Sequence, residues 1–85
     1  MARRIRFTKH ANEKFSFLLN YGFRINKRDV VQTISKPTRV DRKGNQLAAM
    51  REINDKYALR VVYAQRNGII IVVTFYPVKR KEYGI

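Results

Sequence analysis

Hydrophobic and polar residues alternate most clearly between residues 57 and 77. Two runs rich in β-branched and aromatic side chains, 57–63 and 69–77, flank a short polar segment that ends in Asn67-Gly68. This arrangement is the strongest short-range signal for a β-hairpin. We therefore expect this hairpin to organise the rest of the fold.

The loop length of the hairpin sets its register. A two-residue loop would pair Arg66 with Ile69 and place Arg60 beside Phe75 on a mainly apolar face. A three-residue loop with Gly68 in the left-handed conformation would separate apolar from polar side chains more cleanly. Because a slip of one residue moves every side chain to the other face, we expect the three-residue loop.

In this register one face of the hairpin is dry and packs under helices. Its expected members are Leu59, Val61, Tyr63, Ile71, Val73 and Phe75. The other face is half-polar, and we expect function there. Its expected members are Arg60, Val62, Val72, Thr74 and Tyr76.

The N-terminal half of the chain predicts a strand and two helices. Residues 3–7 alternate basic and apolar side chains, as in a strand with one face in the core. Thr8 is a suitable N-cap for a helix over residues 9–21, in which apolar residues recur at helical spacing. Asn26 can cap a second helix, which ends before Pro37.

Further strands are expected around the hairpin. Residues 38–40 open one strand, and residues 46–53 read as another, although 48–52 are also compatible with a helix. Pro77 should close the last strand, leaving a basic tail over 78–83. The predicted class is α+β: strand, helix, helix, then a three- to four-stranded antiparallel sheet with both helices on one face. The first strand should lie beside a later one.

Length and composition indicate one small domain spanning residues 1–85, with 45% hydrophobic residues. Such a domain buries only about 60% of its unfolded surface, so it would gain stability from a partner or as a homodimer. The absence of cysteine and the single histidine argue against a metal site, and no cofactor is expected. The longest apolar run, 69–73, is too short to span a membrane, and no signal peptide is visible, so a cytoplasmic location is expected.

Charge points to the partner. The chain has 19 Lys and Arg against 6 Asp and Glu, a net charge of +13. This excess predicts a polyanionic partner such as RNA or an acidic protein. The acidic residues are scattered along the chain, which argues against hydrolysis by two metal ions.

Several segments, taken together in order and spacing, resemble a known family. They are Phe7–Ala11, Ile25–Pro37, Leu59–Tyr63, Ile71–Pro77 and Arg80–Tyr83. The chain resembles the prokaryotic family called domain of unknown function 4258, which looks like a branch of the RelE/ParE toxin superfamily. The resemblance covers nearly the whole chain.

The resemblance implies a RelE-like toxin-type domain, often encoded beside an antitoxin. RelE-type members cut mRNA on the ribosome without metal: the ribose 2′-hydroxyl attacks the adjacent phosphate and leaves a cyclic phosphate end. ParE-type members share the fold but act on gyrase, and fold alone does not choose between them. Our first hypothesis is a metal-independent, ribosome-dependent mRNA endonuclease. The alternative is a non-catalytic basic module that binds RNA or an acidic antitoxin.

Cleavage of this kind needs positive charge on the phosphate and groups that move protons. The resemblance implies that Arg60 contacts phosphate, where a guanidinium can clamp two oxygens. It also implies catalytic roles for Arg80 and Tyr83 at the end of the pattern. The alternatives without function are that Arg60 is a solvated arginine on an open sheet face and that Arg80 and Tyr83 belong to a frayed basic tail.

The remaining candidates have weaker signals. His10 matches the Lys-His pair at the start of the family's first helix and would act as general acid or base, although such a histidine is often structural. Lys9 is an alternative phosphate contact. Tyr76 would offer a stacking platform for a base, and Lys79 and Lys81 would add electrostatic attraction.

Overall fold

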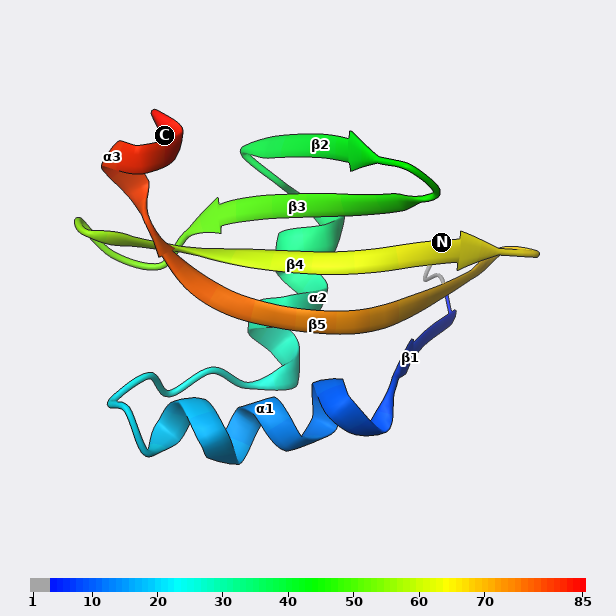
Figure 1. Cartoon of the computed structure of the whole chain (residues 1–85), viewed down its shortest axis with the longest axis horizontal. Helices are drawn as coiled ribbons and strands as arrows, with labels where there is room; N and C mark the ends of the chain where they lie inside the picture. The colour runs from blue at the N-terminus through cyan, green and yellow to red at the C-terminus, as the bar shows by residue number, and fades with distance from the viewer. Residues whose placement is uncertain (1–3) are drawn as a thin grey trace.

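The computed structural model describes residues 4–85 of the chain and confirms the α+β class (Figure 1). The elements in chain order are β1 (Arg4–Phe7), α1 (Lys9–Leu19), α2 (Lys27–Ser35), β2 (Arg39–Lys43), β3 (Gln46–Glu52), β4 (Tyr57–Arg66), β5 (Ile69–Lys79) and α3 (Arg80–Tyr83). Within this described part, no helix is both long and apolar enough to cross a bilayer.

The strands form one mixed sheet in the order β1-β5-β4-β3-β2. The sheet therefore has five strands, in place of the predicted three to four antiparallel ones. β1 lies beside a later strand as expected, but it pairs with β5 in parallel and at the sheet edge. The other pairs are antiparallel because short turns join them, whereas no turn constrains β1 against β5.

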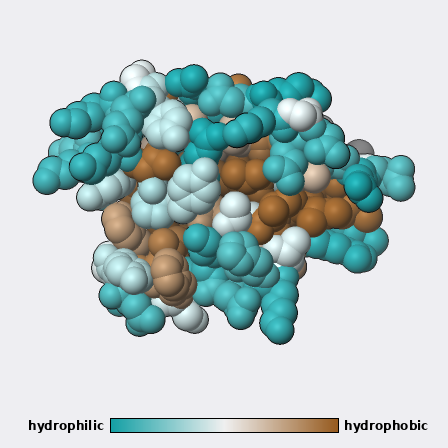
Figure 2. Space-filling model, viewed as in Figure 1, coloured by the Kyte–Doolittle hydropathy of each residue, from teal (hydrophilic) through white to brown (hydrophobic). Residues whose placement is uncertain are grey.

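Both long helices cover one face of the sheet, as predicted, and α2 passes behind the strands in the view of Figure 1. The residues they bury form one apolar core: Ala11, Leu18, Ile25, Val30, Ala49, Leu59, Val61, Tyr63, Ile70, Val72 and Phe75. We call the opposite face of the sheet the open face; of residues 4–85, it carries only the short helix α3, at one end. In the same view, Figure 2 shows an apolar band between hydrophilic regions.

Local capping fixes both long helices. The Thr8 hydroxyl accepts a hydrogen bond from the backbone N–H of Ala11 at the start of α1. Asn26 and Asp29 form a reciprocal capping box at the start of α2. α1 ends at Leu19, earlier than the predicted residue 21, because the chain already turns there toward Gly22, which has a φ of 88°.

The β4–β5 turn corrects the predicted hairpin register. Arg66 pairs with Ile69, so the loop has two residues, and the predicted three-residue loop is wrong. Asn67 and Gly68 both have positive φ, 50° and 76°, which matches the right-handed twist of the strands. The change of register occurs further along, between Val62 and Tyr63.

A β-bulge makes this change. Tyr63 pairs with Val72 and Val62 pairs with Thr74, so Val73 is an extra residue in β5. Thr8 occupies the bulge: its N–H donates to the Val72 carbonyl and its hydroxyl to the Val73 carbonyl, both at 3.1 Å. The bulge thus lies where β1 ends and the chain turns into α1.

The bulge restores the predicted faces at one end of the hairpin only. Leu59, Val61 and Phe75 face the helices, and Arg60, Thr74 and Tyr76 share the open face, as expected. Nearer the turn the prediction is wrong. The core takes Ile70 and Val72 there, in place of the expected Ile71 and Val73.

The strand ends also differ from the prediction. β5 continues through Pro77 to Lys79, because β1 has already ended and a proline is tolerated where a strand has a neighbour on one side only. The expected basic tail forms the last strand residues and α3. Residues 46–52 form a strand, so the helical alternative over 48–52 is wrong.

Candidate functional site

A row of directly opposed residues crosses the open face. Arg39 on β2 pairs with Met50 on β3, and Met50 pairs with Arg60 on β4. Arg60 in turn pairs with Tyr76 on β5. Opposed residues point to the same side of a sheet, so two arginines flank a fully buried methionine and a tyrosine completes the row.

Helix α3 covers part of this row through its last residue. The Tyr83 ring faces the Arg60 guanidinium, whose central carbon lies 5.4 Å from the ring centroid. The Tyr83 carbonyl accepts a hydrogen bond of 2.8 Å from Nη1 of Arg39. Two arginines of this row, on either side of Met50, therefore hold the C-terminal helix against the open face.

Arg60 carries a charge that the described residues leave uncompensated. Its side chain is half-buried, and its Nε is fully buried with no hydrogen-bond partner among residues 4–85. The one salt bridge in that range joins Arg39 to Asp41 at 3.1 Å and does not include Arg60. A buried N–H without an acceptor costs about 1–3 kcal/mol, so this side chain carries an unsatisfied polar group as well as an unpaired charge.

The open face brings three of the predicted residues together: Arg60, Tyr76 and Tyr83. It also includes Arg39, which sequence reasoning missed because its strand had only a weak signal. The Arg39–Asp41 pair is about 40% exposed and therefore contributes little to stability. Arg39 matters more for its bond to Tyr83.

Lys14 is a second residue that sequence reasoning missed. Its ammonium lies 5.9 Å from the Tyr76 ring centroid and 5.4 Å from that of Phe17. The available signal was helical spacing, since Lys14 lies four residues after His10 and therefore on the same helix face. It adds positive charge beside the Tyr76 end of the row.

His10 lies on α1 rather than on the sheet. It is exposed and lines a shallow groove of 240 Å³ with Glu13, Lys14 and Phe17. Through Lys14 this groove adjoins Tyr76. Lys9, at the start of α1, is exposed as well.

Arg80 is tied to the backbone. Its Nε donates to the Ile85 carbonyl and its Nη1 to the Asn54 carbonyl, both at 3.1 Å. Its own N–H donates to the Lys56 carbonyl at 2.8 Å. Arg80 therefore joins α3 to the β3–β4 turn, in addition to any contact with a ligand.

Glu52, at the end of β3, is the one group with a clearly perturbed pKa among the described residues. A hydrogen bond from the Thr38 hydroxyl lowers the pKa of this carboxyl below its ordinary value, with smaller contributions from nearby Arg80 and Arg51. In residues 4–85 no three His, Asp or Glu side chains gather to hold a metal ion.

Comparison with known proteins supports the fold. No family model and no curated protein matches the sequence. The solution structure of a conserved hypothetical protein from Helicobacter pylori, HP0894, resembles this chain with a TM-score of 0.54 and 18% identity, covering 89% of this chain and 94% of that one. At this identity the likeness shows the fold alone.

Proposed function

We propose that the chain is a RelE/ParE-like domain, of the kind called domain of unknown function 4258, that acts on RNA through the open face of its sheet. The observation that carries the proposal is Arg60. Its guanidinium lacks a carboxylate partner among residues 4–85, its Nε lacks an acceptor, and an aromatic ring lies against it. A phosphate supplies the missing negative charge, and tyrosines beside it can stack on bases.

The proposed reaction is cleavage without metal on the ribosome. The ribose 2′-oxygen attacks the adjacent phosphorus, and the 5′-oxygen of the next nucleotide leaves with a proton. The products are a 2′,3′-cyclic phosphate and a 5′-hydroxyl end. Arg60 stabilises the charge that develops on the phosphate oxygens, while Tyr83 or His10 transfers the proton.

A second function, binding without catalysis, is favoured by two specific observations. Tyr83 covers Arg60 with its ring, and Arg80 already donates two side-chain hydrogen bonds to backbone carbonyls. Tyr83 and Arg80 are thus already engaged in contacts within the protein, which favours a structural role for them over a catalytic one. In this alternative the open face holds RNA, or an acidic segment of an antitoxin, in a cytoplasmic protein.

Mapping of new RNA 3′ ends in a cell-free translation reaction separates the two functions. The reaction compares the unmodified chain with Arg60→Ala and with Arg66→Ala, which removes the same charge from the turn end of the same strand. Arg80→Ala is less informative, because it also breaks the bonds to Asn54 and Ile85. Ribosome-dependent cuts that end in cyclic phosphate and vanish only in Arg60→Ala support the enzyme. Intact mRNA at protein well above ribosome concentration rejects it and leaves the binding function.

A further inference from the structure

A cavity of 370 Å³ lies at the other end of the sheet from the β4–β5 turn, and the proposed function does not use it. We call it the Tyr57 cavity after its aromatic residue. Its lining residues are Asp55, Lys56, Tyr57, Lys79 and Lys81. The volume falls within the range of roughly 300–1,000 Å³ that small-molecule sites occupy.

The Tyr57 cavity is separate from the Arg60 row. Tyr57 lies two residues before the core residue Leu59 on the same strand, so it belongs to the helix-covered face of the sheet. Lys79 pairs with Tyr57 and therefore belongs to the same face. Arg60 points to the opposite face. Within α3, Lys81 and Tyr83 are two positions apart, so their side chains leave the helix on nearly opposite sides, roughly 200° apart. Helix α3 therefore lies between the Tyr57 cavity, which Lys81 lines, and the Arg60 row, which Tyr83 contacts.

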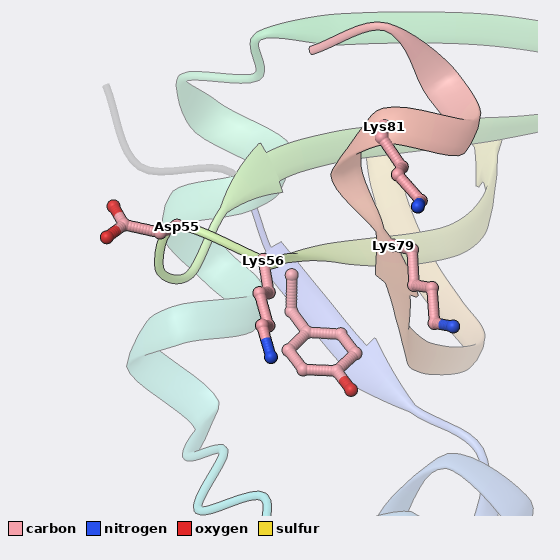
Figure 3. Close-up of a pocket in the computed structure, with 5 residues that line it drawn as sticks. Asp55, Lys56, Lys79 and Lys81 are labelled. Carbon is pink, nitrogen blue, oxygen red and sulfur yellow. The ribbon is translucent and has the colours of Figure 1, made fainter.

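Its charges are arranged around an aromatic ring. Figure 3 shows Lys79 and Lys81 on one side of the cavity and Lys56 on the other, with the Asp55 carboxylate pointing away from all three. The three lysines thus line the cavity without a carboxylate directed among them. Lysine binds phosphate oxygens as a point charge.

The backbone and the aromatic ring beside the cavity are fixed in place without a ligand. Asn54 Oδ1 accepts hydrogen bonds of 2.9 Å from the N–H groups of both Lys56 and Tyr57. Arg80 donates to the carbonyls of Asn54 and Lys56. The Tyr57 ring is fixed by an edge-on contact with Phe23, with centroids 5.0 Å apart and planes at 87°. A preformed site loses less entropy on binding.

From these observations we infer that the Tyr57 cavity binds a nucleotide, with the base against the Tyr57 ring and the phosphates between the lysines. A flat aromatic surface suits a base, and three separated cations suit more than one phosphate. An acidic peptide would use the lysines but not the ring. The inference goes beyond the proposed function, because Arg60 plays no part in it.

Titration of the ¹⁵N-labelled chain with ADP tests the inference directly. We expect amide signals of residues 54–57 and 79–81 to shift, while those of residues 39 and 60 stay in place. Inorganic pyrophosphate and adenosine, each added alone at the same salt concentration, should bind about tenfold more weakly than ADP, because each makes only part of the contact. Pyrophosphate that binds as tightly as ADP would overturn the inference.

A double variant separates a site from general attraction. Lys56→Ala with Lys81→Ala should weaken ADP binding about tenfold or more. Lys36→Ala with Lys43→Ala removes the same charge from exposed lysines elsewhere and should change binding less than about twofold, since long-range attraction is screened by salt. Equal weakening in both would show that net charge alone attracts ADP, and the site would be rejected.

Two sources of the nucleotide can be distinguished with the Arg60→Ala chain. ADP represents a free nucleotide, and a 5′-phosphorylated trinucleotide of RNA represents the end of a longer chain. Stronger shifts at residues 54–57 with ADP would assign a free nucleotide, and stronger shifts with the trinucleotide would assign an RNA end. Failure of both rejects the Tyr57 cavity without affecting the role proposed for Arg60.

Discussion

The Arg60 guanidinium lies against the Tyr83 ring, 5.4 Å from its centroid, and this contact joins the middle of the sheet to the end of the chain. A residue of β4 and a residue 23 positions later thereby share one polar surface. The contact places an aromatic ring beside the cation that is proposed to hold phosphate. It also gives the short helix α3 a reason to fold onto the sheet, since four residues alone do not form a stable helix.

Substitution of Tyr83 tests this contact. Tyr83→Leu should lower the free energy of unfolding by about 0.5–1 kcal/mol, the typical value of a partly exposed cation–π contact. Tyr83→Phe keeps the ring and should be nearly neutral. Urea denaturation of the three chains gives the comparison. Equal stability of the Leu and Phe variants would show that the ring contributes nothing there.

Thr8 should matter more than its position near the N-terminus suggests. Its hydroxyl accepts from Ala11 N–H and donates to the Val73 carbonyl, so Thr8→Ala removes a helix cap and a bond to the bulge together. We expect a loss of about 1–3 kcal/mol in the free energy of unfolding. Thr8→Ser keeps both bonds and serves as the control. An unchanged denaturation midpoint in Thr8→Ala would contradict the description of the bulge.

The neighbours Val72 and Val73 report on the hairpin register. Val72 is fully buried under the helices, whereas Val73 is half-buried at the bulge. Val72→Thr places a hydroxyl in the apolar core and should cost about 1–3 kcal/mol, clearly more than Val73→Thr. Thermal or urea unfolding of the pair decides. If Val73→Thr were instead the less stable variant, the result would support the three-residue loop that the sequence favoured and contradict the observed register.

These two tests also show where the sequence was informative. The Thr8 cap, the Asn26 capping box and the position of the hairpin turn at Asn67-Gly68 have signals that lie within a few residues, and these were predicted correctly, although the length of the loop was not. The bulge at Val73 was not, because it depends on Thr8, which is 65 positions away in the chain. The expectation of clean alternation was sound, but the sequence could not show that a bulge, rather than the loop, produces it.

The candidate site was predictable to a similar degree. Alternation along the strands correctly put Arg60, Thr74 and Tyr76 on one face. Arg39 and Lys14 were missed, because their closeness to that face follows from strand order and from how α1 packs beside β5. Pairing across strands that are distant in sequence decides such neighbourhoods, and no local pattern records it.

The Thr38–Glu52 hydrogen bond predicts a pH effect. Thr38→Val removes the donor, so the pKa of Glu52 should rise toward its ordinary value, while Thr38→Ser should keep it low. Because the pKa is lowered in the folded state, the stabilisation is present above the ordinary pKa and is lost as pH falls through the folded one. Carboxyl NMR titration measures the shift. Identical Glu52 titration in all three chains would contradict the assignment.

The most direct test of the central claim is the affinity of a short single-stranded RNA for the unmodified chain, Arg60→Ala and Arg66→Ala. Fluorescence anisotropy at one salt concentration gives the three Kd values, and thermal melting checks that each variant is folded. If Arg60 holds a phosphate, Arg60→Ala should weaken binding about tenfold or more, and Arg66→Ala by less than about threefold. Equal weakening in the two folded variants would mean that RNA binds through net charge alone, and this result would reject the open face as the RNA-binding site.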